Sequence, residues 1–285
     1  VTDTSTITLQ VIAGHSDKGA DNGMTIPTHT TFGDCLRDWR GRRGMSQLQL
    51  ALSANVSQRH VSFLESGRAQ PSRPMVLGLA DAMSVPLAER NILLNAAGFA
   101  PQYRQTSLDD SALQDVRAAL DLMLERHMPY PAVLIDRYWN LLDANASCET
   151  IFGMSAGPAR INILKMIADH PQLTEKFVNW PEVAHHFLMR LQTEFNASGG
   201  DAKLAELIEG LKATPAFEAA GQHTSASHPF IPTKIKFGDK VLSLVSAVAH
   251  FGTATDITVS DLRIEFSLPA DAETDAAIKQ LAGQL

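Results

Sequence analysis

Residues 45–71 read MSQLQLALSANVSQRHVSFLESGRAQP and contain the local signals of two short helices joined by a sharp turn. Ser46 is a good helix N-cap, and Gln49 three residues later completes a capping box. Asn55 is one of the few non-glycine residues that tolerate a left-handed backbone, so it suits the turn. Ser57 then caps the second helix. This pattern predicts a helix–turn–helix, in which the second helix enters the major groove of DNA.

The second helix of the pair carries the candidate base-reading residues. Val61 and Leu64 form its buried face at i, i+3 spacing. Off that face lie an amide, a guanidinium, a hydroxyl and an aromatic ring, on Gln58, Arg59, Ser62 and Phe63. Because hydrogen-bonding side chains of this kind bind base edges, the sequence predicts double-stranded DNA as a partner.

Helical patterns on both sides of this pair complete a five-helix head over residues 32–104. The head has nine Arg, no Lys and five acidic residues, a balance of +4. Residues 105–285 have 14 basic and 23 acidic residues, a balance of −9. A basic head on an acidic body (residues 105–285) fits a head whose affinity comes from contacts with DNA phosphates. A net charge of +4 alone lies within the ordinary range for a domain.

Two stretches of the sequence resemble the XRE/Cro-type helix–turn–helix family of phage repressors and bacterial regulators: SQRHVSFLESGRAQPS and LAERNILLNAAGFAP. The resemblance implies a phosphate contact for Gln47, an ion pair between Arg40 and Glu65, and a groove-facing role for the four residues named above. Phe63 departs from the polar residue of many relatives, so its expected target is a thymine methyl or an apolar sugar edge. Arg68, just past the helix end, is expected to contact the DNA backbone.

Residues 105–285 have the pattern of an α+β domain with an antiparallel sheet. Residues 129–153 predict two strands and a helix, which is how PAS-like domains begin. Further strands are predicted at 231–237, 241–250 and 262–268, after helices near 161–168, 181–196 and 202–211. The predicted fold class is multidomain: an all-α, lambda-repressor-like head and an α+β, PAS-like domain whose helices lie across one face of the sheet.

The stretches MPYPAVLIDRYWNLLDANASCETIFG and LSLVSAVAHFGTATDITVSDLRIEFSLPAD resemble the MmyB-like ligand-binding domain that follows an XRE-type head in many bacterial regulators. With the head, the resemblance covers about residues 32–283. It implies a PAS-like sensor with an internal apolar pocket for a fatty-acid-like or other hydrophobic ligand.

The body has more apolar periodicity than a small sheet needs, which predicts a cavity between the sheet and the helix at 181–196. We expect few polar groups in this cavity. Its expected lining is Leu134, Trp139, Phe187, Leu191, Leu244 and Phe251. Buried aromatic residues are more often plain core than ligand contacts, and this alternative stays open for Trp139.

Motifs of other functional classes are missing. The chain has no G-x-S-x-G elbow and no glycine-rich phosphate loop. His185 and His186, adjacent on one helix, point about 100° apart and do not readily share a metal. Cys35 and Cys148 have no CxxC spacing, so both are expected to be reduced. We therefore expect no catalysis, metal or cofactor, no membrane segment, and a place in the bacterial cytoplasm with the nucleoid.

The sequence favours a regulator that binds an operator as a homodimer, because one recognition helix covers half of a palindromic site. In one alternative, the body binds a protein partner and no small molecule. In another, an enzyme carries a DNA-binding appendage, against which the missing motifs argue. Residues 1–31 are expected to be a disordered leader.

Overall fold

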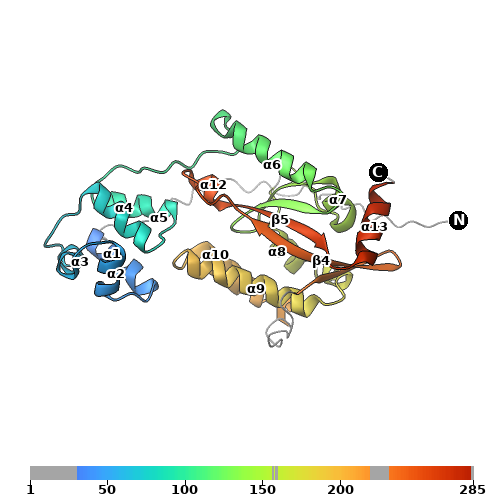
Figure 1. The fold of residues 1–285 in the computed structure, drawn as a ribbon. Coiled ribbons are helices and arrows are strands. Elements are labelled where there is room, and N and C mark those ends of the chain that lie inside the picture. The colour runs from blue at the N-terminus through green and yellow to red at the C-terminus, as the bar shows by residue number, and fades with distance from the viewer. Residues whose placement is uncertain (1–30, 156, 158–159, 219–230, 284–285) are drawn as a thin grey trace, which may run out of the picture.

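The computed structural model describes residues 31–155, 157, 160–218 and 231–283. Figure 1 shows a helical head, in blue and cyan, beside a larger body built around a sheet. Except for Thr31, the leader expected at 1–31 lies outside the described residues. Within the described part of the chain, none of the helices has the length and apolarity needed to cross a bilayer.

The head consists of five helices: α1 (Phe32–Arg42), α2 (Gln47–Ser53), α3 (Gln58–Glu65), α4 (Arg73–Ala82) and α5 (Leu87–Ala96). The first four begin after a hydroxyl side chain that accepts a backbone N–H: Thr31, Ser46, Ser57 and Ser72. Ser46 and Gln49 form the predicted capping box. Asn55 has a φ of 53° in the turn between α2 and α3. Both local predictions are therefore confirmed.

The core of the head joins all five helices. It contains Leu36, Leu50, Val61, Leu64, Leu79 and Leu94, each at most 1% exposed. Helix α1 passes α3 very closely at Gly33, where an added Cβ would lie 2.7 Å from the backbone oxygens of Leu64 and Glu65. This close approach fixes α3 against α1 and leaves the opposite side of α3 free to face outward.

The body is built on five antiparallel strands in the order β2-β1-β5-β4-β3. Their bounds are β1 (Ala132–Asp136), β2 (Leu141–Ala144), β3 (Thr233–Phe237), β4 (Lys240–Ala249) and β5 (Leu262–Pro269). All five strands were predicted, and the fold class of a helical head with an α+β body on an antiparallel sheet is confirmed. The order places β1 and β5 side by side although more than 120 residues separate them along the chain.

Helices cover both faces of the sheet, whereas the sequence predicts helices on one face. On one face, α6 (Gln114–Arg126) packs on β1 and β5. Against the other lie α8 (Ile163–Asp169), α9 (Trp180–Ala197), α10 (Ala202–Lys212) and α11 (Pro215–Glu218). Adjacent residues of β1, Leu134 and Ile135, point to opposite faces and are 0% and 1% exposed. Their burial is the physical sign of a sheet covered on both sides.

The remaining elements flank the sheet: the 3-10 turns at Ser111–Leu113 and Pro171–Lys176, and α7 (Ala146–Phe152), α12 (Ile257–Asp261) and α13 (Ala272–Ala282). The chain leaves the head beside α12, where the N–H of Ile257 donates to the carbonyl of Arg104 at 2.8 Å. Thr106 Oγ1 also donates to Asp256 at 2.6 Å. These bonds tie the connecting segment to the body.

Candidate DNA-binding surface and ligand pocket

The outward side of α3 displays the four predicted base-reading residues. Gln58 and Arg59 are exposed in the first turn of the helix, and Ser62 and Phe63 are half-buried one turn later. The opposite side of α3 is anchored by Val61 and Leu64 in the core of the head. The structure therefore presents these side chains together on one accessible surface, as a groove-reading helix requires.

Phe63 lies between two arginines. The guanidinium carbons of Arg59 and Arg68 are 5.1 Å and 6.0 Å from the centre of its ring. Arg59 is one helical turn before Phe63, and the chain after α3 returns Arg68 to the same place through a bond from its N–H to the carbonyl of Phe63. Sequence reasoning missed this role. The ring serves as a platform that orients two cations over the outward side of α3.

The pair predicted between Arg40 and Glu65 is present. Arg40 donates from Nε to Oε1 of Glu65 at 2.6 Å and from Nη2 to Oε2 at 3.1 Å. Gln47 donates to the same carboxylate at 2.9 Å. The Glu65 side chain is 3% exposed. Burial raises the pKa of Glu65, but the hydrogen bonds from Arg40 and Gln47 outweigh it and bring the pKa below its ordinary value.

This network occupies the amide of Gln47, for which the family resemblance implies a phosphate contact. Its Nε2 points to Glu65 in this structure. The contact with phosphate stays a prediction. One N–H of the amide is held by Glu65, so the second N–H of Nε2 and the backbone N–H of Gln47 at the start of α2 are the candidate donors for it.

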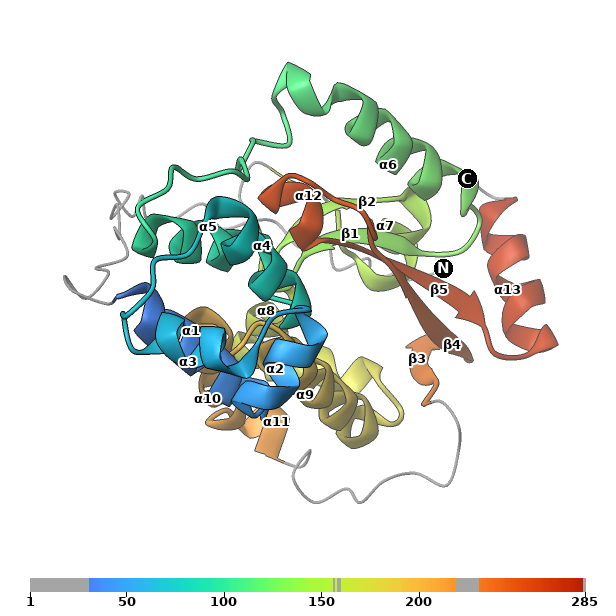
Figure 2. The ribbon, with the colours of Figure 1, turned by 60° about the vertical axis from the view of Figure 1, so that its left-hand side comes forward.

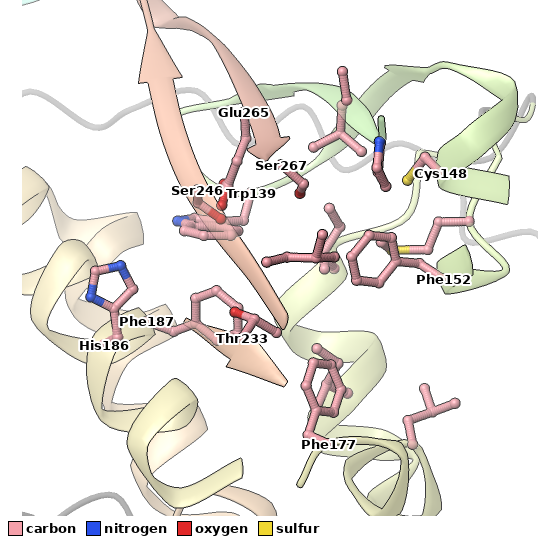
Figure 3. Close-up of a pocket in the computed structure, with 18 of the residues that line it drawn as sticks. Trp139, Cys148, Phe152, Phe177, His186, Phe187, Thr233, Ser246, Glu265 and Ser267 are labelled. Carbon is pink, nitrogen blue, oxygen red and sulfur yellow. The ribbon is translucent and has the colours of Figure 1, made fainter. Parts of the chain in front are cut away.

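The body contains a pocket of about 270 Å³ between the sheet and the helices α7, α8 and α9. Figure 3 shows Cys148 and Phe152 on the α7 side and His186 and Phe187 on the α9 side. Most of the lining is apolar and includes Val133, Trp139, Phe152, Ile167, Phe177, Phe187 and Leu244. Burial raises the pKa of the Cys148 thiol to about 12, so this sulfur stays protonated.

Polar groups at the pocket are more numerous than the sequence predicts. Glu265, Ser267, Ser246 and Thr233 come from the same face of neighbouring strands, and His186 comes from α9. The polar residues of β5 face the pocket because helices cover this side of the sheet as well. Glu265 is bound by Arg190 at 3.0 Å. Burial, and then the charge of Arg190, lower the pKa of His186, which favours its neutral form.

Three of the six predicted lining residues, Trp139, Phe187 and Leu244, line this pocket. Leu191 is buried in the core on the same side of the sheet. Leu134 and Phe251 belong to the core under α6, on the opposite face. The alternation of a strand shows which residues share a face. It does not show which face lines a cavity when both faces are apolar, as they are here.

Several lining residues were missed by the sequence analysis, among them Phe152, Met154, Phe177 and Thr233. Phe152 ends α7, Met154 lies just beyond it, and Phe177 lies between the second 3-10 turn and α9. Residues at element ends have no periodic signal of their own, so only the packing of the chain reveals them.

Comparison with protein families gives two matches that divide the chain in the same way as the structure. The MmyB-like transcription regulator ligand binding domain matches residues 116–281, which is more than half of the chain. A helix-turn-helix domain family matches residues 31–93. Comparison with curated proteins gives no match.

Two solved structures share low similarity with the chain. The PAS domain from Bordetella pertussis BvgS is 15% identical, with 60% of this chain and 100% of that chain covered and a TM-score of 0.28. An RNA-binding Light-Oxygen-Voltage receptor is 13% identical, with 90% of this chain and 65% of that chain covered and a TM-score of 0.25.

Proposed function

Because this chain belongs to the MmyB-like transcription regulators, with a helix–turn–helix head and a ligand-binding body, we propose that a small hydrophobic ligand controls its binding to an operator in double-stranded DNA. The ligand, fatty-acid-like or another hydrophobic molecule, occupies the pocket of the body. The regulator acts as a homodimer in the bacterial cytoplasm, at the nucleoid, and neither catalyses a reaction nor needs a cofactor.

The observation that carries the ligand proposal is the pocket itself. Its volume of about 270 Å³ is close to the lower end of the roughly 300–1,000 Å³ usual for small-molecule sites. A mostly apolar lining, with polar groups gathered on the strand side and His186 facing them from α9, suits a molecule that is apolar over most of its length. A ligand changes DNA affinity only through different affinities for two arrangements of the protein.

The first prediction concerns base reading by α3. Arg59→Ala and Gln58→Ala should each relax the sequence preference, and Arg59→Ala should cost about 1–3 kcal/mol of operator binding, because base-edge contacts are lost. Binding selections over randomised sites measure both effects. Arg68→Ala is the matched control: it removes the other guanidinium on Phe63 and should weaken all sites alike, with a salt slope lower by about one. Unchanged base preference in both α3 variants would remove the assignment.

The second prediction concerns the pocket. A panel of long-chain acids, alcohols and other hydrophobic metabolites should contain compounds that stabilise the full chain, by about 2.7 kcal/mol at 100 times Kd. Ser246→Phe, on the pocket face of β4, should abolish the thermal shift because its ring fills the space. Ala247→Phe places the same ring on the other face of the strand and should preserve the shift.

A true effector must also change operator affinity, and the operator must change effector affinity by the same factor. Native mass spectrometry of the purified full chain distinguishes a small-molecule ligand from a protein partner of the body. A bound hydrophobic mass supports the small-molecule proposal. A chain with no such mass, and no thermal shift with any compound of the panel, favours a protein partner for the body instead.

A further inference from the structure

The head docks on the body at the C-terminal end of α9. The guanidinium of Arg43 donates to the carbonyls of Asn196 at 3.0 Å and Ala197 at 2.7 Å. It also donates to the carbonyls of Met83 at 2.8 Å and Ser84 at 3.0 Å, at the end of α4. The last carbonyls of a helix have no partner within it. A single side chain therefore joins a helix end of the head to a helix end of the body.

Trp39 of α1 rests on a glycine beside this contact. Gly199 has a φ of +77°, and a Cβ added to it would overlap the Trp39 ring. Arg42 donates to the carbonyl of the same glycine. The guanidinium carbons of Arg42 and Arg43 lie 5.5 Å and 5.2 Å from the centre of the Trp39 ring. The fit is closer than any residue with a side chain would permit at position 199.

The turn between β1 and β2 lies close to the same interface. Tyr138 donates to Asp201, the N-cap of α10, at 2.8 Å. Arg137 lies 3.5 Å from Asp261, its side chain is 10% exposed, and its buried Nε has no hydrogen-bond partner. Burial raises the pKa of Glu89 of α5, and the nearby charges include Arg42, Asp201 and Arg137. Helix α5 of the head also contacts α12, whose last residue is Asp261, the partner of Arg137, so α5 lies beside this turn.

The next residue of the turn lines the ligand pocket. Trp139 has a φ of 68°, which is strained for a bulky residue. Its ring lies 5.1 Å from the ring of Phe187 and 4.4 Å from the guanidinium carbon of Arg190. Both partners belong to α9. From Phe187 to Ala197 the helix rises about 15 Å, so one continuous helix joins a pocket-lining residue to the carbonyls that Arg43 binds. Figure 2 shows α9 running behind the helices of the head.

We propose that α9 and the β1–β2 turn couple the pocket to the head, and that pocket occupancy acts on DNA binding by changing how the head sits on the end of α9. The proposal rests on the proposed function. Gln58 and Arg59 are exposed while the head is docked, so the body does not mask the recognition helix. The docking contact instead sets the orientation of that helix, and this orientation decides whether two half-sites are reached together in a dimer.

A double-mutant cycle on the full chain tests this coupling without an identified ligand. Trp139→Phe perturbs the pocket end, Arg43→Ala perturbs the docking end, and operator Kd is measured for both and for the double variant. The operator Kd of the double variant should differ by about 2- to 30-fold from the value obtained by multiplying the two single effects on Kd. This is the range for residues on one coupled element. Gly78→Ala is the control, because Gly78 lies inside α4 and a Cβ added there would meet nothing within 4 Å; its cycle with Trp139→Phe should be additive.

Gly199→Ala provides a second docking variant from the body side, in case Arg43→Ala unfolds the head. Hydrogen exchange over residues 196–201 gives a readout that needs no DNA. Trp139→Phe and Arg43→Ala should each raise this exchange several-fold, and Gly78→Ala should not. If the chain binds no operator, the proposed function is contradicted. The coupling can still be tested in that case, because hydrogen exchange does not require DNA. Additive cycles with both docking variants, or exchange unchanged by Trp139→Phe, would overturn the coupling.

Discussion

Replacing Glu65 by alanine is expected to lower the free energy of unfolding of the head by about 3–5 kcal/mol. The change leaves Arg40, whose side chain is 18% exposed, without its carboxylate. It also leaves the amide of Gln47 without its acceptor. A charge that stays partly shielded from water without a partner costs more than the pair contributed. Hydrogen exchange of α1 and α3 amides in the full chain measures the loss without interference from the body.

Two controls separate this effect from ordinary surface electrostatics. The Asp38–Arg42 pair lies in the same helix with both side chains more than 40% exposed, so Asp38→Ala should cost only about 0–1 kcal/mol. Adding Arg40→Ala to Glu65→Ala should recover part of the loss, because the unpaired cation is removed. A coupling energy of zero in this cycle would refute the pair as a source of stability.

The pair also predicts a direction of pH dependence. The folded-state pKa of Glu65 lies below its ordinary value of 4.5. The contribution of the carboxylate is therefore complete above that value and is lost as the pH falls through the lowered folded-state pKa. Acid titration of wild type and Glu65→Gln should show a steeper loss of head stability for the wild type in this window.

Gly33→Ala is expected to destabilise the head by about 1–3 kcal/mol or more, against the usual benefit of alanine in a helix. The added methyl would meet two backbone oxygens of α3 at 2.7 Å, and backbone atoms cannot turn aside as a flexible side chain can. Relief requires α1 and α3 to separate, which opens the core around Leu36 and Leu64. Urea unfolding followed by hydrogen exchange in the head measures the change.

Gly78→Ala is the matched control for that substitution. Gly78 lies inside α4, and a Cβ there would meet nothing within 4 Å. The same chemical change should therefore stabilise the head by about 0.5–1 kcal/mol through helix propensity alone. If both substitutions change the free energy of unfolding in the same direction, the close crossing of α1 and α3 is contradicted.

Much of the head follows from local chemistry. The caps at Ser46 and Ser57 and the left-handed turn at Asn55 each depend on residues within a few positions along the chain. The pairing of Arg40 with Glu65 spans 25 positions and was accessible only through the family resemblance. The stacking of Arg59 and Arg68 on Phe63 was not anticipated, because Arg68 reaches the ring only after the chain has turned past the end of α3.

The strands of the body are predictable from the sequence alone, because alternation with a period of two is a property of each strand. The sequence does not indicate that both faces of the sheet are covered. For that reason Leu134 and Phe251 were placed at the pocket although they lie in the core under α6. Nothing in the sequence indicates that Arg43 binds the carbonyl of Asn196 or that Trp39 rests on Gly199. These contacts join residues more than 150 positions apart, so they depend on the packing of two whole domains.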